Sequence, residues 1–238
     1  MKRKKRLVSK EIRSYFDSLG ASCLQFQHFI DGVKNAVPDT VVFGGMVRDF
    51  HFDRPSNFQS DIDLVCMASS SDVERLIRDF DPVKNKFGGF RLLAGKQPVD
   101  IWALDQTWAF KQGLAQANGI SDLCATTFFN VDAAYVSLRD WSVNRSPIFE
   151  EAIDTDVLDL NLERNPSPSK ATQRAISLSV KLGLDLSPRL QRYVLDNADE
   201  SLYVRPVYGI YLKLLGEHVA STDSSARPFR FSPQASLM

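Results

Sequence analysis

The sequence predicts an α+β fold, with a head of a small mixed sheet and flanking helices, followed by a short helical module. Short β-branched and apolar runs alternate with amphipathic stretches up to about residue 140, which is typical of a sheet packed against helices. Further along, Ser-Pro pairs open helical patterns. We therefore expect a head at residues 1–140, a helical module at 141–220 and, from its Ser and Pro content, a disordered tail at 221–238.

Composition indicates the class of protein but says little about its binding partners. A hydrophobic content of 44% and a charged content of 24% are ordinary for a soluble globular chain. The 29 basic residues balance the 29 acidic ones, so net charge favours no partner. No apolar run reaches the roughly 18 residues that a membrane span needs, and we expect a cytoplasmic protein without membrane contact. The basic run from Met1 to Arg6 either contacts nucleic acid or is a solvated terminus.

The first part of the head reads as helices around a strand. Ser9 is the predicted N-cap of the first helix. Gly44-Gly45 ends the strand and precedes a further short helix. The expected ranges are helix 9–20, helix 24–33, strand 40–43 and helix 46–52.

The rest of the head reads as strands with one clear helix between them. Ser71 to Glu74 is a capping box. Residues 94–98 are expected to form a hairpin loop. The expected ranges are strand 61–67, helix 71–80, strands 87–93 and 99–104, a helix within 108–118, and β-like runs at 126–129 and 131–138.

The module after the head reads as an irregular stretch and three helices. Residues 141–164 are acidic and show no regular pattern. Ser167-Pro168 and Ser187-Pro188 supply the N-cap and first-turn signals of two helices. A last helix is expected around residues 207–215.

Three aspartates form the main candidate for chemistry. Asp61 and Asp63 alternate with Ile62, so on a strand both project from one face. Asp100 lies between apolar residues on another expected strand and projects in the same isolated way. Carboxylates this close repel one another unless cations hold them together, and Mg²⁺ or Mn²⁺ favours such hard oxygen ligands. We therefore expect Asp61, Asp63 and Asp100 to act as metal ligands and as catalytic residues.

The pattern indicates phosphoryl transfer. Two metal ions roughly 3.5–4 Å apart can hold the attacking and leaving oxygens of an in-line displacement. The implied reaction is attack of a hydroxyl on the α-phosphate of a nucleoside triphosphate, with release of pyrophosphate. Gly44 and Gly45 lack side chains that would block the phosphates, and the helix that follows offers N–H groups to anions. Arg48 either reaches the triphosphate or pairs with Asp49 or another acid.

These motifs resemble a known family. Residues 42–49, Val-Phe-Gly-Gly-Met-Val-Arg-Asp, resemble the opening motif of class II CCA-adding enzymes and bacterial poly(A) polymerases, in the DNA polymerase beta nucleotidyltransferase superfamily. Residues 60–65, Ser-Asp-Ile-Asp-Leu-Val, resemble its metal-binding strand. Residues 87–101 resemble its next strand pair, and 127–135 a weakened form of its Arg-Asp-Phe-Thr-Ile-Asn-Ala-Leu motif. Residues 174–184 lie where the family has its neck helix, so the resemblance covers about residues 40–190.

The resemblance implies a polymerase beta-like head, metal chemistry, and ATP or CTP as substrate. It assigns Gly44, Gly45, Arg48, Asp49, Ser60 and Arg174 to nucleotide binding. Asp49 reads from its position as a structural brace, and Arg174 reads equally well as a surface residue. The neck helix opens with Ser167-Pro168-Ser169-Lys170 where the family has Asp-Pro-x-Arg, so selection of C, C and A does not follow.

Three functional readings remain open. The first is transfer to an RNA 3′ end such as tRNA, which the neck resemblance and the basic N-terminal run favour. The second is transfer to a protein or a small molecule, as in a toxin or a phage-defence system. The third is a degenerate module that binds nucleotide, RNA or a partner protein, which the weakened motifs favour.

Aromatic residues near the motifs either contact the substrate or pack in the core. Trp102 lies two residues after Asp100, so a regular strand places both on one face. Phe128, Phe129 and Tyr135 suit core packing better than base stacking.

Overall fold

The computed structural model describes residues 8–52, 58–85, 88–221 and 227–231. Within these ranges the chain divides into two compact units. The first unit ends at Ser146 except that residues 128–131 belong to the second, which continues from Pro147. The expected head boundary at residue 140 therefore moves to 146, because the strand at Val143–Arg145 pairs with its neighbour in the head sheet. Among the described residues no helix has the length and apolar character that a bilayer span requires.

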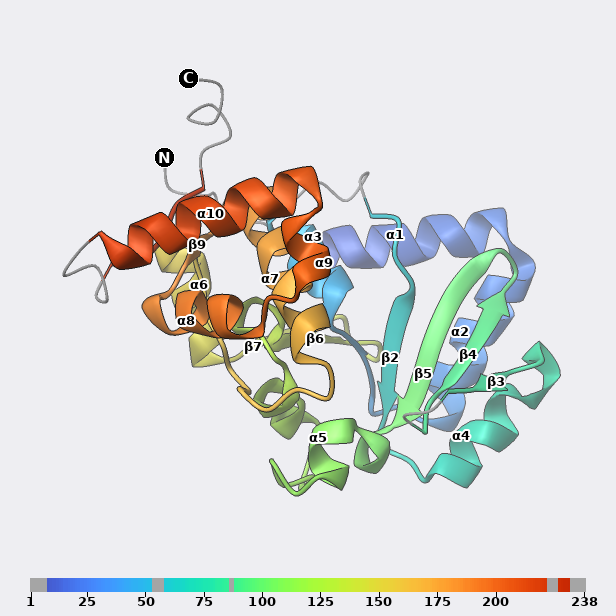
Figure 1. The fold of residues 1–238 in the computed structure, drawn as a ribbon. Helices are drawn as coiled ribbons and strands as arrows, with labels where there is room; N and C mark the ends of the chain where they lie inside the picture. Colours follow the sequence, from blue (N-terminus) through green and yellow to red (C-terminus); the bar gives the residue numbers. More distant parts are fainter. Residues whose placement is uncertain (1–7, 53–57, 86–87, 222–226, 232–238) are drawn as a thin grey trace. The chain divides into compact units, whose positions relative to one another are not determined.

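A seven-stranded mixed sheet forms the centre of the first unit (Figure 1). Its order is β3-β4-β5-β2-β1-β6-β7. The pair β2 and β5 is parallel, and the other neighbours are antiparallel. The strands are β1 (Thr40–Phe43), β2 (Ile62–Cys66), β3 (Val83–Lys84), β4 (Phe90–Ala94), β5 (Gln97–Ala103), β6 (Ala134–Ser137) and β7 (Val143–Arg145).

Helices cover one face of this sheet. α2 contacts β4, α4 contacts β5, and α3 contacts β1 and β6 (Figure 1). Side chains alternate along each strand, so Ile62 and Leu64 share one face of β2 and are fully buried. The helices of the first unit are α1 (Val8–Ser22), α2 (Leu24–Ala36), α3 (Gly45–Phe52), α4 (Ser70–Ile77) and α5 (Trp108–Lys111), with 3₁₀ turns at Arg78–Phe80, Leu104–Gln106 and Ile120–Thr126. A further 3₁₀ turn, Asn130–Asp132, begins in the segment assigned to the second unit and ends at Asp132 in the first.

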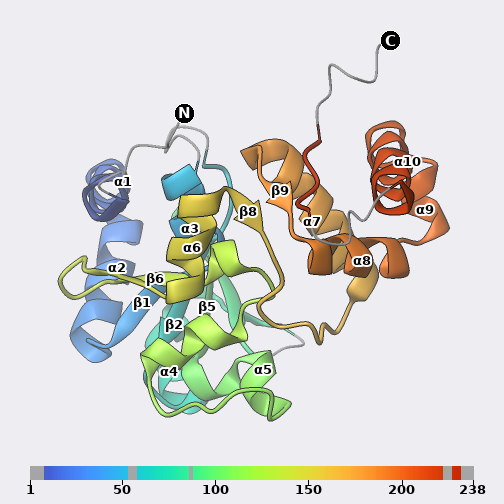
Figure 2. The same ribbon diagram turned by 90° about the vertical axis from the view of Figure 1, so that its left-hand side faces the viewer.

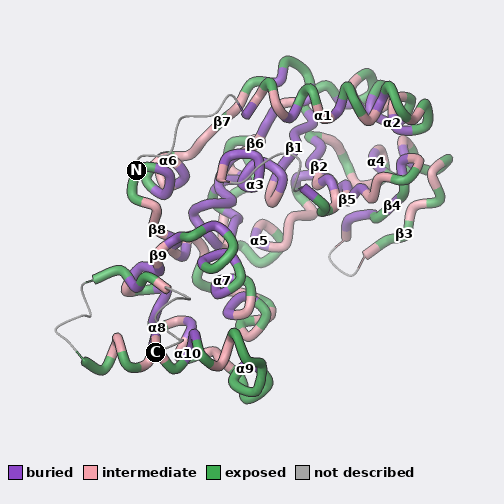
Figure 3. Tube along the Cα trace, turned by 90° about the horizontal axis from the view of Figure 1, so that it is seen from above, coloured by how far each residue is buried: buried purple, intermediate pink, exposed green. Residues whose placement is uncertain are grey.

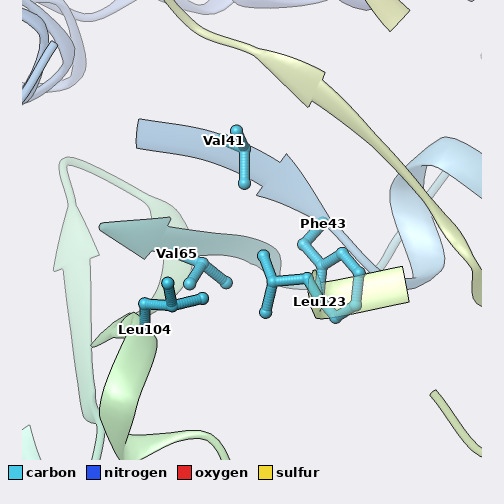
Figure 4. Close-up of a cluster of buried hydrophobic side chains, with 5 residues drawn as sticks. All are labelled: Val41, Phe43, Val65, Leu104 and Leu123. Carbon is cyan, nitrogen blue, oxygen red and sulfur yellow. The ribbon is translucent and has the colours of Figure 1, made fainter. Parts of the chain in front are cut away.

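The other face of the sheet carries a second, smaller apolar cluster (Figure 4). The partly buried side chains of Trp102 and Phe110 pack against it. β1 and β2 are therefore buried along most of their length (Figure 3). The cluster consists of Val41, Phe43, Val65, Leu104 and Leu123.

The second unit is mainly helical. Helices α7, α8 and α10 pack on one another (Figure 2), and the buried Tyr211 hydroxyl donates to Ser179 Oγ at 2.9 Å. A short parallel pair, β8 with β9, completes the unit. Its elements are α6 (Pro147–Thr155), β8 (Val157–Leu158), α7 (Pro168–Leu182), β9 (Asp185–Leu186), α8 (Pro188–Asn197), α9 (Glu200–Tyr203) and α10 (Pro206–Ala220).

Two stretches differ in type from the sequence prediction. Residues 141–164, expected to be irregular, contain β7, α6 and β8. The pair Ser146-Pro147 opens α6 with the same signal that was used at Ser167-Pro168. The expected β-like run at 126–129 is wrong, because Thr126 ends a 3₁₀ turn and only Phe129 forms an isolated bridge, to Leu160.

Helix starts and the tail also differ in detail. Ser9 lies inside α1, where its hydroxyl donates to the carbonyl of Trp141. The N-cap of α4 is Ser69 and not Ser71, since the Ser69 hydroxyl accepts the Asp72 N–H. Disorder does not hold for residues 227–231, because Phe229 is buried and exchanges backbone hydrogen bonds with Leu186. The rest of the tail beyond Ser221 lies outside the described residues.

Candidate functional site

Two of the three predicted aspartates are direct neighbours in the sheet. Asp63 on β2 lies opposite Asp100 on the parallel strand β5. Asp61 lies just before β2 rather than within it, and its side chain is about one-third exposed. The Asp100 side chain is 18% exposed, so both carboxylates are only partly accessible to solvent. The structure thus brings together residues that lie far apart in the chain.

Arg91 on β4 ties two of these carboxylates together. Its Nη2 lies 2.6 Å from Asp61 Oδ2 and 2.7 Å from Asp100 Oδ2, and its Nε donates to Asp100 Oδ1 at 2.8 Å. Hydrogen bonding to Asp100 and the negative charges of Asp100 and Asp61 raise the pKa of Arg91 above its ordinary value. The Arg91 guanidinium therefore offsets the repulsion between the Asp61 and Asp100 carboxylates.

The role of Arg91 was missed in the sequence, although a signal for it exists. The turn between β4 and β5 contains only Gly95 and Lys96, so Ala94 pairs with Gln97. Counting back from such a tight hairpin places Arg91 opposite Asp100, as observed. The expectation of a longer loop at residues 94–98 concealed this register.

The donor set suits a hard divalent cation. Asp61 Oδ2 and Asp100 Oδ2 converge on the same arginine nitrogen, and carboxylate oxygens are the ligands that Mg²⁺ prefers. Within the described ranges no group of three or more His, Cys, Asp and Glu side chains is already arranged as a set of metal ligands. A metal ion at these oxygens would therefore require the Arg91 side chain to move away from them.

Gly44 fits closely against Asp63. It has a φ of +72°, and a Cβ atom at this position would lie 3.1 Å from Asp63 Oδ2. Phe43 pairs with Asp63 across β1 and β2, so the chain passes the carboxylate at the start of α3. Gly45 begins that helix, whose first N–H groups have no partner within it. An anion held there would lie on the β1 side of Asp63.

We expect Gly44→Ala to impair both stability and any reaction at this site. The left-handed backbone costs a non-glycine residue about 1–2 kcal/mol. The new methyl group also displaces the Asp63 carboxylate, and misplaced reactive groups reduce rates by about ten- to a hundredfold. Gly113→Ala is the matched control, because Gly113 has a φ of +66° and open space where the methyl would lie. Equal reaction rates in the two variants, at similar thermal stability, would contradict the contact argument.

Arg48 points to acids rather than to open solvent. Its Nε donates to Asp49 Oδ1 at 2.8 Å and its Nη1 to Asp132 Oδ1 at 2.5 Å, and all three side chains are 9% exposed. Burial by itself lowers the pKa of Arg48, but attraction to Asp132 and Asp49 outweighs burial and raises it. Of the two sequence readings for Arg48, this structure shows the ion pair, and Asp49 is its brace.

The two remaining residues predicted to bind nucleotide, Ser60 and Arg174, are surface positions. Ser60 is exposed just before Asp61, with its carbonyl 3.5 Å from Gln97 Nε2. Arg174 is exposed on α7 in the second unit. Phe129 is buried and Tyr135 packs against the smaller apolar cluster, in line with core roles. The shared face of Asp100 and Trp102 is confirmed, because both line the same pocket.

Comparisons with known proteins concern the fold. No protein-family model and no curated protein sequence matches the chain. A Thermotoga maritima CCA-adding enzyme complexed with tRNA superimposes with a TM-score of 0.55 at 19% identity, over 81% of this chain and 47% of that one. A tRNA nucleotidyltransferase with a primer tRNA and an incoming ATP analogue gives 0.54 at 15% identity, over 78% and 58%. A CCA-adding enzyme with ATP gives 0.51 at 20%, over 91% and 49%.

This chain spans about half the length of those solved structures. At identities this low the likeness is one of architecture, and it agrees with the mixed sheet and the flanking helices described above. The chain therefore has a nucleotidyltransferase-like α+β fold, similar to that of CCA-adding enzymes.

Proposed function

We propose that this protein is a metal-dependent nucleotidyltransferase that moves a nucleoside monophosphate from ATP or CTP to a hydroxyl at an RNA 3′ end and releases pyrophosphate. The observation that carries the proposal is the pairing of Asp63 with Asp100 on neighbouring parallel strands, beside the left-handed Gly44 at the start of α3. The nucleotidyltransferase-like fold supports it, since several structures of that fold are described with ATP, CTP or tRNA.

In this proposal each group has a distinct task. Asp61, Asp63 and Asp100 would hold Mg²⁺ or Mn²⁺, which when bound activates the attacking hydroxyl and stabilises the leaving oxygen. Gly44 and Gly45 leave space for the triphosphate, whose charge the first N–H groups of α3 attract. The buried ion pairs of Arg48 fix α3 and thereby the position of these N–H groups.

Arg91 competes with the cation for the same oxygens. We expect Arg91→Gln to tighten Mn²⁺ binding by about two- to thirtyfold, because exposed ion pairs contribute about 0.2–1 kcal/mol each and two are lost. Titration followed by electron paramagnetic resonance of free Mn²⁺ measures this without any turnover. Arg75→Gln is the control, since Arg75 is also an exposed arginine but pairs with Asp72 on α4. Weaker Mn²⁺ binding in Arg91→Gln would show that the arginine supports the cation rather than competes with it.

The position of Arg91 also favours a second candidate function. A cation built into the chain can neutralise Asp61 and Asp100 without any metal, as in a degenerate module that binds nucleotide or RNA but does not react. Asp63 argues for the enzyme, because an extra carboxylate next to Asp100 adds repulsion that a purely structural site does not need.

Label transfer separates these candidates. The purified protein is incubated with Mg²⁺, total tRNA and each α-labelled nucleoside triphosphate in turn, and then with EDTA in place of Mg²⁺. Metal-dependent label in RNA supports the proposal, and the preferred triphosphate defines the base. Label on the protein itself or in a small product keeps the chemistry but moves the acceptor. Triphosphate binding without transfer supports the binding module. If the protein neither binds triphosphate nor transfers label, the proposal is wrong.

A further inference from the structure

A pocket of about 250 Å³ opens beside the carboxylates in the first unit. Asp63 and Asp100 line it together, and Trp102 and Trp108 contribute aromatic surface. Thr107, Gln106, Asn85 and Gly89 add polar groups and backbone. Its size suits a single ring system with its attached sugar, since pockets for larger drug-sized ligands begin at roughly 300 Å³.

The Trp102 indole is held in a fixed orientation. Part of it packs against the smaller apolar cluster, and its Nε1 donates to Thr107 Oγ1 at 3.2 Å. Gly89 leaves space for it, because a Cβ atom there would lie 3.1 Å from Trp102 Cβ. An aromatic surface that is fixed before binding loses little conformational freedom when a ligand stacks on it. The pocket is thus suited to a flat aromatic group.

The order of strands decides which substrate group meets this pocket. Asp63 lies between Gly44, at the end of β1, and Asp100 on β5. In an in-line displacement the attacking and leaving oxygens lie on opposite sides of the phosphorus. If the triphosphate lies at Gly44 and the start of α3, the attacking hydroxyl must approach from the Asp100 side. The pocket lies on that side.

We infer that this pocket receives the terminal nucleoside of the nucleic-acid acceptor, with its base against Trp102 and Trp108 and its sugar hydroxyl next to Asp100. The inference rests on the proposed function for the direction of attack. Stacking is available to every base, so the pocket holds the acceptor end without selecting its sequence. Any choice of base among triphosphates is then made elsewhere.

Variants of Trp108 give the kinetic test, because Trp108 lies on the short α5 and not within the sheet. We expect Trp108→Leu to raise the KM for the RNA acceptor by about 5- to 150-fold, the range found when a base loses an aromatic partner. Trp108→Phe restores most of the loss. The KM for the nucleoside triphosphate stays within roughly twofold, since removal of one binding contact changes the KM of the ligand that made it. Phe110→Leu on the same helix is the control, because Phe110 packs on the apolar cluster and does not line the pocket.

A binding measurement complements the kinetics and needs no reaction. The probe is a single-stranded hexaribonucleotide, with either a normal or an abasic 3′-terminal residue, and quenching of tryptophan fluorescence reports its binding. We expect the abasic probe to bind at least about fivefold more weakly to the wild type. In Trp108→Leu the difference between the two probes should shrink, because Trp102 is then the one aromatic partner left for the base among the described residues of the pocket.

The outcomes separate this inference from the proposed function. Transfer to RNA with an unchanged acceptor KM in Trp108→Leu overturns the pocket assignment and leaves the function intact. A rise in the KM for the triphosphate instead also overturns it, since the pocket then holds the incoming base. Base-dependent quenching without transfer supports the pocket as a nucleoside site and refutes the enzyme. Equal binding of both probes to the wild type overturns the inference.

Discussion

Asp63→Asn is expected to lower nucleotidyl transfer by about a thousandfold or more while leaving the fold in place. Asparagine keeps the shape of the side chain and removes its charge, and stabilisation by a metal ion contributes several kcal/mol, at about 1.4 kcal/mol per factor of ten. Asp63 is the central position of the site, because it pairs with Asp100 in the sheet and lies against Gly44. Among the described residues of the site, no other charged side chain lies next to both Asp100 and Gly44.

The measurement is the initial rate of label transfer from the preferred triphosphate, together with the thermal unfolding temperature. Asp105→Asn is the matched control, because Asp105 is an exposed aspartate on the 3₁₀ turn after β5 and does not line the pocket. It should retain the wild-type rate. A rate of Asp63→Asn within tenfold of the wild type would exclude the carboxylate cluster as the centre of the reaction.

Arg48→Met is expected to destabilise the first unit by about 3–5 kcal/mol, since removal of one partner from buried ion pairs leaves uncompensated charge. Asp49 and Asp132 both lose a buried partner, and methionine replaces the volume but not the charge. For a domain of this size that loss corresponds to a fall in unfolding temperature of about 6–20 °C. Differential scanning calorimetry measures it directly.

Arg91→Met is the comparison variant for this prediction. Arg91 also binds two aspartates, but its side chain is 60% exposed, and exposed ion pairs contribute about 0–1 kcal/mol. We expect its unfolding temperature to change by a few degrees at most. If the two variants lose similar stability, burial of the Arg48 ion pairs is not the source of the effect.

The sequence predicted the head of the fold well because its signals there are local. The strand at residues 40–43, the glycine pair and the alternation of Asp61 with Ile62 each depend on a few consecutive residues. Helices α7 and α8 also begin at their Ser-Pro pairs. The same local signal at Ser146-Pro147 was overlooked because the acidic surroundings suggested an irregular segment.

By itself, then, the sequence determined the α+β class and proposed three aspartates as candidate metal ligands, since periodicity and turn signals depend on neighbouring residues. Only the tertiary structure decided that Asp63 pairs with Asp100, that Arg91 binds Asp61 and Asp100, and that Arg48 binds Asp132. Those contacts join residues from separate strands and loops. Their formation depends on strand order and register, which are set by the packing of the whole sheet and not by any local run of residues.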